Sequence, residues 1–428
     1  MDQAIAYLKK LPHTEVKPGL ERTRALLESV GNPHEKLRTV HIGGTNGKGS
    51  VAALCASVLQ SAGYRVGLYT SPHLVSYCER IQINGAPITE DEFADIADEL
   101  MPIADSMTDT PTQFEFLTAL AFLYFARRKI DIAVIEVGLA GRFDATNVVT
   151  PLVSVLTNVE LDHTDLLGGT IEQIAWEEAG IAKSAVPLVT GERKPSALEI
   201  IARECTAVGA PLICARERAR ALDFSWEHQE FAIKTLDPSP LISPLPLRGE
   251  GVGVRVNLRL LGGYQRENLN VALEALEVLR QTLEISPEAL RAGLEQTSWP
   301  GRFEVVHKRP YIVLDGAHNP HAARALREDV RRYREKYTLQ KSALLFGVLK
   351  EKDYSAMAEI LFPEFDEIVL VKPDSPRALD PYALLPSASQ AKICDTIPEG
   401  LDVARATGAE LICVTGSLYL VGAVKRLL

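Results

Sequence analysis

The sequence has few of the features that mark secreted, zinc-binding or membrane-spanning proteins. Six cysteines are scattered through 428 residues, without a CxxC pair or the spacing of a zinc site, so we expect reduced, mostly buried thiols. No apolar run approaches the roughly 18 residues of a membrane helix. The N-terminal stretch MDQAIAYLKKLPH lacks the long apolar core and cleavage site of a secretion signal. A soluble, cytoplasmic protein is therefore expected.

Positive charge is also in deficit. The chain has 46 lysines and arginines against 56 aspartates and glutamates, a net charge of -10. This balance argues against a general nucleic-acid or anionic-membrane surface, although it leaves room for a local basic pocket. We find no nucleic-acid motif and no internal repeat, and the length allows two or three domains. The expected partners are small molecules, and the expected state is a monomer.

One stretch, residues 37–63, has the clearest local pattern. Its β-branched start at 39–42 predicts a strand, and apolar residues at helical spacing after Ser50 predict a helix that Gly63 caps. Between strand and helix lies the loop Gly43-Gly44-Thr45-Asn46-Gly47-Lys48-Gly49-Ser50.

This loop has the composition of a phosphate cradle. Glycines let backbone N–H groups approach phosphate oxygens, and the helix N-terminus adds a positive dipole end. Lys48 would neutralise the outer phosphates and Ser50 could ligate magnesium. The ordinary P-loop has Ser or Thr directly after the lysine, whereas Gly49 intervenes here. The alternative is a glycine-rich turn with a chance lysine, but the flanking strand and helix favour a nucleotide site.

Strand-like and helix-like segments alternate up to residue 214, which predicts a doubly wound α/β domain with a parallel sheet. Helices are expected within 2–30, broken around Pro12 and Pro18, and at 90–104, 113–128 and 171–183. Strands are expected at 65–69, 132–135, 152–156, 186–189 and 212–214.

The pattern changes after residue 222. Residues 223–262 alternate polar and apolar side chains, as hairpin strands do, around a Pro- and Gly-rich segment, 237–254, that indicates a long exposed loop or a tolerated insertion. Helices at 265–282 and 287–296 follow, and the composition breaks at 297–301. A second α/β domain is then expected, with strands at 311–314, 342–346, 367–371 and 411–414 and helices at 321–337, 354–361, 400–407 and 417–427.

Ligands of open α/β sheets collect at the carboxyl ends of the strands. In the first domain that edge should carry, besides the 43–50 loop, Ser71, His73, Glu136, Asp162 and His163. Glu136 ends an apolar strand, where an unpaired carboxylate is costly, so it either binds a metal or pairs with Arg142 or Lys48. A hydroxyl, a carboxylate and an imidazole on one rim suit magnesium or manganese beside ATP phosphates.

These residues belong to a longer series of matching motifs. The chain resembles the Mur ligase superfamily nearly end to end, and within it the folylpolyglutamate synthase/dihydrofolate synthase group. The matching segments are KPGLER (17–22), GTNGKGS (44–50), YTSPHL (69–74), EVGLAGRFDATN (136–147), LDHTD (161–165), IAWEEAGIAK (174–183), GYQRENLNVAL (263–273), PGRFEVV (300–306), DGAHNPHAA (315–323), GVLKEKD (347–353) and VTGSLYLVG (414–422).

The resemblance implies an ATP-dependent ligase that phosphorylates a substrate carboxylate and lets the amine of L-glutamate displace the phosphate. The acceptor would be a folate, dihydropteroate or both. It also implies a P-loop-containing, doubly wound ATP-binding domain with a small β-hairpin subdomain (residues 1–297), followed by a smaller Rossmann-like glutamate ligase domain (298–428). A Mur-type ligase with another acceptor and a non-catalytic ATP- or folate-binding relative are the alternatives.

The resemblance also assigns roles to single residues. Residues 44–50 and Lys48 would bind ATP, together with Asn268, Arg302, Asp315 and His318. Two magnesium ions, and as an option a monovalent cation, would lie near Ser50, Ser71, Glu136, His163 and the residue at 178, while Asp144, His318 and Ser417 would contact substrate. Lys48, Glu136, His163 and Glu178 form the implied catalytic set. For other assigned residues a structural role is the alternative: a helix cap for Asn268 and Ser417, a linker salt bridge for Arg302, and a turn for Asp144.

Position 178 departs from the family pattern. The family's EKAGI segment supplies a lysine whose carbamate binds the second magnesium, and this chain has Glu178 instead. Glu178 would replace the carbamate directly or through a water. The competing interpretation is a weakened second metal site in a slow, specialised or inactive protein.

Overall fold

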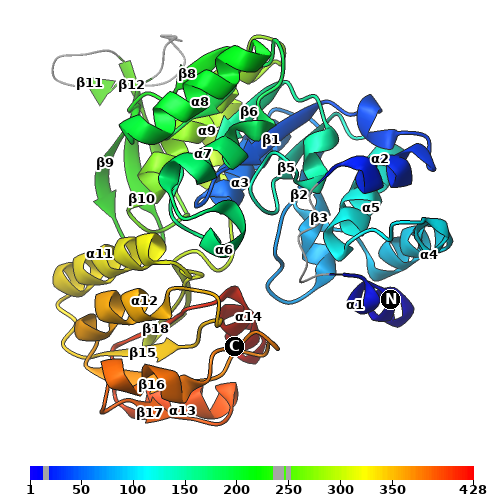
Figure 1. Ribbon diagram of the computed structural model, residues 1–428. Helices are drawn as coiled ribbons and strands as arrows, with labels where there is room; N and C mark the ends of the chain where they lie inside the picture. Colours follow the sequence, from blue (N-terminus) through cyan, green and yellow to red (C-terminus); the bar gives the residue numbers. More distant parts are fainter. Residues whose placement is uncertain (13–18, 235–244, 247–251) are drawn as a thin grey trace. The chain divides into compact units, whose positions relative to one another are not determined.

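The computed structural model describes residues 1–12, 19–234, 245–246 and 252–428. Its chain divides into two compact units (Figure 1). Unit 1 consists of Met1–Ala221, Phe231–Asn257 and Arg266–Thr297, and unit 2 of Leu222–Glu230, Leu258–Gln265 and Ser298–Leu428.

Unit 1 is built on an eight-stranded sheet in the order β4-β3-β2-β5-β1-β6-β7-β8. The six neighbouring strands β2, β5, β1, β6, β7 and β8 run parallel to one another. At the edge beside β2, the strands β3 and β4 are added in antiparallel pairings. The strands are β1 (Thr39–Gly43), β2 (Val66–Tyr69), β3 (Ile81–Ile83), β4 (Ala86–Pro87), β5 (Ile132–Glu136), β6 (Val153–Leu156), β7 (Leu188–Thr190) and β8 (Leu212–Cys214). Strands β1, β5 and β6 are buried throughout, as expected of a parallel sheet covered on both faces.

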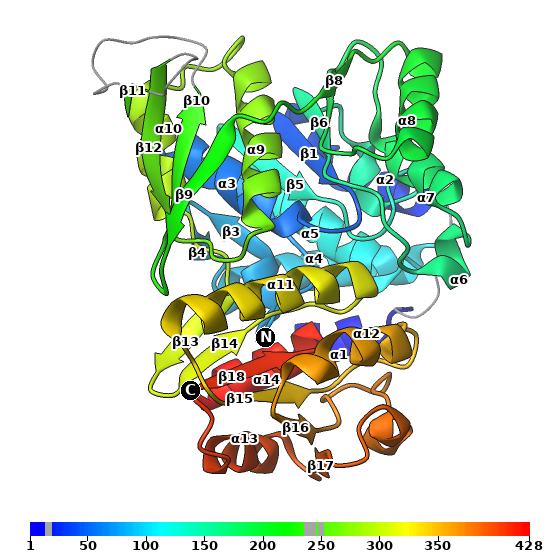
Figure 2. The ribbon, with the colours of Figure 1, turned by 90° about the vertical axis from the view of Figure 1, so that its left-hand side faces the viewer.

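Helices cover both faces of this sheet (Figure 2). They are α1 (Asp2–Lys10), α2 (Glu21–Glu28), α3 (Lys48–Ser61), α4 (Glu90–Ser106), α5 (Gln113–Arg127), α6 (Thr164–Leu167), α7 (Ile171–Glu178), α8 (Pro195–Val208), α9 (Gln265–Leu279) and α10 (Pro287–Gln296). Gly63 follows the last turn of α3 with φ +92°, the left-handed conformation that ends a helix, so the predicted cap is confirmed.

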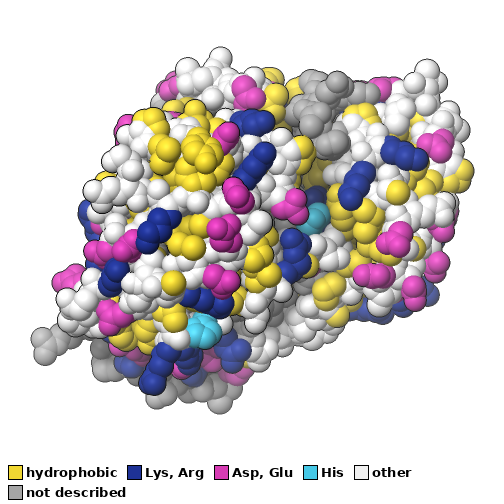
Figure 3. Space-filling model, turned by 90° about the horizontal axis from the view of Figure 1, so that it is seen from below, with side chains coloured by type: hydrophobic (Ala, Val, Ile, Leu, Met, Phe, Trp, Pro, Cys, Tyr) yellow, Lys and Arg dark blue, Asp and Glu magenta, His cyan; other side chains and the backbone are white. Residues whose placement is uncertain are grey.

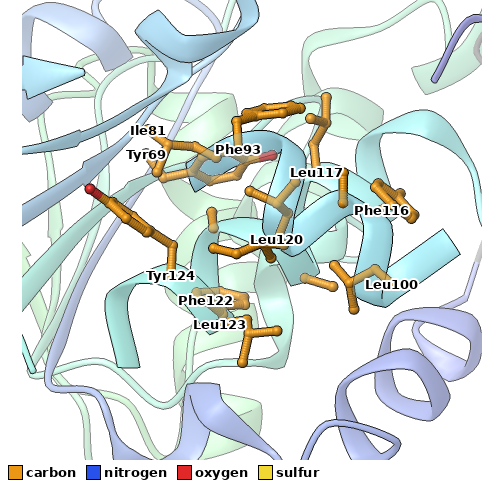
Figure 4. Packing of buried hydrophobic residues seen from close by; sticks show 14 of the residues in the cluster. Tyr69, Ile81, Phe93, Leu100, Phe116, Leu117, Leu120, Phe122, Leu123 and Tyr124 are labelled. Atoms are coloured by element: carbon orange, nitrogen blue, oxygen red, sulfur yellow. The ribbon is translucent and has the colours of Figure 1, made fainter. Parts of the chain in front are cut away.

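One core cluster lies between the sheet and α1, α2, α4 and α5. Figure 4 shows its centre, where Phe116, Leu120 and Phe122 of α5 meet Phe93 of α4 and Tyr69 of β2. Helix α5 is buried along nearly its whole length, which fixes β2 and β5 and therefore the polar residues at their carboxyl ends.

A second, four-stranded sheet, β11-β12-β10-β9, is formed by β9 (Ala219–Phe224), β10 (Gln229–Lys234), β11 (Leu245–Pro246) and β12 (Val252–Leu258). The hairpin expected at 223–262 is thus present. Most of the loop or insertion expected at 237–254, and Pro18, lie outside the described residues.

Unit 2 contains a six-stranded sheet in the order β13-β14-β18-β15-β16-β17, parallel except for β13. The strands are β13 (Glu304–Lys308), β14 (Tyr311–Leu314), β15 (Ser342–Phe346), β16 (Glu367–Leu370), β17 (Lys392–Ile393) and β18 (Leu411–Thr415). Helices α11 (Pro320–Tyr337) and α12 (Tyr354–Leu361) pack in one core cluster with the sheet, and α13 (Ile397–Ala406) packs on its other face, with α14 (Leu418–Leu427) beside it. The predicted fold class is confirmed.

Several element predictions need correction, and the short strands β3, β4 and β17 were not predicted. The helix expected at 171–183 ends at Glu178 and continues as a 3₁₀ turn, because the carbonyl of Glu177, which a continuing helix would use for residue 181, accepts the N–H of Arg142. Strand β13 was not predicted; it is a partly exposed edge strand with a bulge. Helix α13 begins at Ile397, not at residue 400, because Thr396 caps it.

The structure shows the surface charges and the cysteines, which were expected to be reduced and mostly buried. Figure 3 shows acidic and basic side chains interspersed over the face in view. All six cysteines are free thiols, and five of them are buried. Among the described residues, no helix is both long and apolar enough to cross a membrane.

Candidate active site

The loop after β1 has the backbone conformation that its glycines suggest. Gly44 and Gly47 have φ values of +113° and +87°, in the region that disfavours residues with a Cβ. Helix α3 begins at Lys48, and Ser50 is buried in its first turn. The first-turn N–H groups of a helix have no partner within it and are suited to bind an anion.

The segment that follows β6 holds this loop in place. The N–H of Thr45 donates to the carbonyl of Asn158 at 2.9 Å, and that of Asn46 donates to Oδ1 of the same residue at 3.0 Å. The hydroxyl of Thr157 donates to the carbonyl of Asn46 at 2.6 Å. A Cβ on Gly44 would lie 2.2 Å from Thr157 Oγ1. The loop is therefore a rigid, tightly packed turn.

Lys48 and Glu178 hold the two sides of Gly44. Lys48 Nζ donates to the carbonyls of Gly44 at 2.6 Å and Thr45 at 3.2 Å. Glu178 Oε2 accepts the N–H of Gly44 at 2.9 Å. Glu178 is 3% exposed, and burial raises its pKa to about 7, although nearby Lys48 favours the ionised form.

Glu136 lies at the same sheet edge, because Ile42 of β1 pairs with Glu136 of β5. Its buried carboxylate accepts the N–H of Ser71 at 2.9 Å. Arg142, one of the two partners considered for Glu136, instead forms an ion pair with Glu204 at 2.7 Å. The structure thus brings Glu136 and Ser71 together beside the loop.

His163 precedes the short helix α6 and has φ +50°. Its N–H donates to Oδ1 of Asp162 at 2.8 Å. Within the described ranges, no group of three or more His, Cys, Asp or Glu residues is arranged to hold a metal ion. Magnesium bound through a nucleotide uses only one or two carboxylates, so the metal role of Ser50, Ser71, Glu136, His163 and Glu178 stays a prediction.

Two other predicted residues differ in their setting. The buried amide of Asn268, on α9, lies against the loop, since a Cβ on Gly47 would be 2.2 Å from its Oδ1. Asp144 instead accepts four hydrogen bonds from its own loop: the N–H groups of Gly138 and Leu139 on Oδ2, and the N–H and hydroxyl of Thr146 on Oδ1. Asp144 is therefore a turn-forming residue in this structure, and a contact with substrate stays a prediction.

Unit 2 gathers a second set of predicted residues at the ends of β14 and β18. Asp315 is buried and accepts the N–H groups of Phe303 and Ala317, both at 2.8 Å, and the hydroxyl of Tyr264 at 3.1 Å. Burial raises the pKa of Asp315, and nearby Arg302 opposes this.

The other members of this set are held by backbone groups. Arg302 donates to the carbonyl of Gly301 at 3.0 Å. His318 Nδ1 lies 2.7 Å from the carbonyl of Gly316. Ser417 caps α14 by accepting the N–H of Leu420 at 3.2 Å, which is the structural alternative considered for it; a glutamate contact stays a prediction.

Sequence reasoning missed Asn158 and His41. Asn158 forms three hydrogen bonds to the loop through its main chain and side chain, and its place just after a buried strand was the available signal. His41 is fully buried in β1, 2.8 Å from the Thr146 hydroxyl. Burial lowers the pKa of His41 to about 3, so it stays neutral and supports the Asp144 loop.

Comparison with known proteins decides the family. The Mur ligase middle domain model matches residues 42–276, and the model of the Mur ligase glutamate ligase domain matches residues 301–418. The chain belongs to the Mur ligase family. Within this family it resembles the folylpolyglutamate synthase/dihydrofolate synthase group, as the motifs predicted.

Similar proteins span the whole chain. The dihydrofolate synthase/folylpolyglutamate synthase of Bacillus subtilis is 36% identical, over 96% of this chain and 95% of the relative. Mycobacterium tuberculosis folylpolyglutamate synthase complexed with ADP has a TM-score of 0.89 at 30% identity, covering 99% of this Mur ligase and 97% of that chain. Escherichia coli FolC in complex with DHPP and ADP has a TM-score of 0.86 at 30% identity, covering 100% and 97%.

Proposed function

We propose that this Mur ligase is an ATP-dependent enzyme that joins L-glutamate to a folate, to dihydropteroate, or to both. The observation that carries the proposal is the loop at 44–50, where Gly44 and Gly47 leave no room for a Cβ and the N-terminus of α3 follows. Relatives with solved structures in complex with ADP and with DHPP support the choice of nucleotide and acceptor.

The reaction has two steps. A carboxylate oxygen of the acceptor attacks the γ-phosphorus of ATP. ADP departs, and the acceptor becomes an acyl phosphate. The amine of glutamate then attacks the acyl carbon, phosphate departs, and the amine loses a proton. Catalysis of phosphoryl transfer rests mainly on positioning and on charge stabilisation. Lys48 and the amides at the start of α3 supply the positive potential in unit 1.

In unit 1, residues 44–50 and Asn268 are assigned to ATP. In unit 2, Arg302, Asp315 and His318 are assigned to nucleotide contacts. In this assignment Arg302 contacts phosphate. Asp315 contacts the ribose, and its carboxylate is oriented by Phe303, Ala317 and Tyr264. Residues 1–297 form the ATP-binding domain and residues 298–428 the glutamate ligase domain.

Magnesium fits the donor chemistry of the loop rim. Ser50, Ser71, Glu136 and His163 offer hydroxyl, carboxylate and imidazole groups, a set suited to a hard cation that also takes phosphate oxygens and water. When bound, magnesium neutralises charge on the phosphates. Two ions are proposed, with a monovalent cation as a further option.

The acceptor and glutamate are assigned to other residues. The loop that Asp144 organises borders the acceptor, while His318 and Ser417 contact glutamate. The enzyme is proposed to act as a cytoplasmic monomer, and light scattering of the purified protein tests the monomeric state.

Phosphate release tests this function. We expect release only when ATP, magnesium, glutamate and a pterin acceptor are all present, and comparison of dihydropteroate with tetrahydrofolate identifies the acceptor. Lys48→Ala should lose this activity, whereas Lys9→Ala, an exposed change in α1, should keep it. If no pterin acceptor supports release, the proposal fails and another acceptor or a non-catalytic role replaces it.

A further inference from the structure

Glu178 contacts the phosphate-binding loop directly. It is the last residue of α7, and it lies 134 positions along the chain from Gly44, whose N–H it accepts. We propose that Glu178 is a positioning residue that shapes the nucleotide-binding loop through Gly44 without needing a metal ion. This inference rests on the proposed function, because it concerns the same ATP site.

Backbone contacts with residues 141–142 hold the end of α7 in place, so that Glu178 can reach Gly44. The carbonyl of Glu177 accepts the N–H of Arg142 at 2.9 Å. A Cβ on Gly141 would lie 2.6 Å from the carbonyl oxygen of Glu178, so the two backbones pack closely. A Cβ on Gly43 would lie 3.5 Å from Glu178 Oε2. The carboxylate therefore fills a close-packed space against the start of the loop.

Hydrogen bonds then fix both sides of Gly44. Its N–H is bound by Glu178 and its carbonyl by Lys48 Nζ. The two side chains together define the orientation of this peptide.

The contact also determines which amides remain for phosphate. Gly44 donates to Glu178, while Thr45 and Asn46 donate to the carbonyl and Oδ1 of Asn158. These three amides are engaged within the protein, and the N-terminus of α3, which begins at Lys48, is the part that we assign to phosphate. In this arrangement Glu178 orders the first half of the loop so that the second half can bind.

Nucleotide binding without metal separates this role from magnesium ligation. A positioning role predicts that Glu178→Ala weakens binding of a fluorescent ATP analogue by up to about tenfold, the effect of losing one hydrogen bond, equally in EDTA and in magnesium. Glu178→Gln keeps an acceptor oxygen at the same distance and should bind nucleotide nearly as well as wild type. Glu172→Ala, an exposed change on the same helix, is the control.

Kinetics give a second readout. We expect Glu178→Ala to raise the KM for ATP more than it lowers kcat, and Glu178→Gln to restore the KM with an unchanged magnesium midpoint. The inference is overturned if Glu178→Gln needs at least about tenfold more magnesium while both variants bind nucleotide normally in EDTA. If wild type shows no ligase activity, the proposed function fails, but the binding measurements still decide the role of Glu178. Circular dichroism melting confirms that each variant is folded.

Discussion

At the scale of single residues, Gly44 is a position that cannot accept a side chain without rearrangement. Its φ is +113°, and an added Cβ would lie 2.2 Å from Thr157 Oγ1 and 2.8 Å from Thr157 N. A left-handed residue with a Cβ costs about 1–2 kcal/mol, and overpacking adds about 1–3 kcal/mol. We therefore expect Gly44→Ala to lower the free energy of unfolding by both amounts and to weaken nucleotide binding, as measured by urea unfolding and an ATP-analogue titration.

Gly31 provides the matched control for this change. It also has a positive φ, +79°, but an added Cβ would meet nothing within 4 Å. Gly31→Ala should cost only the backbone strain and leave nucleotide binding intact. If Gly44→Ala and Gly31→Ala lowered the free energy of unfolding equally, Thr157 would have moved to make room for the added Cβ, and the expected overpacking cost would be absent.

Asp329 gives the clearest pH dependence. It is 1% exposed, accepts the N–H of Gly263 on both oxygens, and lies 3.0 Å from Arg332. Burial raises its pKa from 3.8 to about 7. Because the folded state binds the proton more tightly than the unfolded chain, the stability that Asp329 contributes is full below pH 3.8 and is lost as pH rises toward 7.

Replacing this carboxyl should remove the dependence. Between about pH 4 and 7, wild type should lose up to about 1.4 kcal/mol per pH unit relative to Asp329→Asn. Urea unfolding at a series of pH values measures the difference, with the exposed Asp402→Asn as control. Parallel stability curves for wild type and Asp329→Asn would contradict the assignment.

The sequence predicted the site most directly where its chemistry is local. The glycine loop, Lys48 and Ser50 are adjacent in the chain, so strand, loop and helix patterns identify them. The hydrogen bond from Gly44 to Glu178 joins positions 134 apart, and neither periodicity nor spacing encodes it. The four internal hydrogen bonds of Asp144 join positions at most six apart, but the sequence left both a turn and a ligand contact open for this residue.

At the scale of elements, prediction succeeded where burial fixes the pattern and failed where tertiary contacts set an end. Strand β5 is an apolar run buried on both faces and was predicted from that run. Helix α7 stops at Glu178 because of packing against residues 141–142, which the apolar period of the helix does not record. Strand β13 has little buried surface and therefore gives a weak signal.

Helices α2 and α5 offer a prediction at this scale. Arg22 of α2 forms a buried ion pair with Glu115 of α5, with 9% and 7% of the side chains exposed. Removing one partner of a buried pair typically costs about 3–5 kcal/mol, whereas replacing both by apolar residues can be nearly neutral. We expect Arg22→Ala to be strongly destabilising in urea unfolding and Arg22→Met with Glu115→Leu to recover much of the loss.

The exposed pair of Arg127 and Glu99, with 46% and 41% of the side chains exposed, is the control. Arg127→Ala should change the free energy of unfolding by less than about 1 kcal/mol. The buried pair would be shown to contribute nothing special if Arg22→Ala and Arg127→Ala had equal effects.

At the scale of the whole molecule, the chain does not divide into units by simple order in sequence. Leu222–Glu230 and Leu258–Gln265 group with unit 2, although residues on either side belong to unit 1. Trp226 explains the first segment, because its ring stacks on Tyr311 at 4.1 Å between centroids. Gly263 explains the second through its bonds to Asp329. A composition break identifies residues 297–301, but it cannot reveal such returning segments.

The change in melting temperature on adding ligands tests the proposed function on the whole protein. A ligand that binds only the native state stabilises it by about 2.7 kcal/mol at a concentration one hundred times its Kd. We expect ATP with magnesium to raise the Tm, and dihydropteroate to raise it further once nucleotide is bound. Lys48→Ala should abolish the first increase, because the lysine that holds the carbonyl of Gly44 is gone, while Lys9→Ala should keep both. A full nucleotide response in Lys48→Ala would mean that ATP binds away from the loop at 44–50.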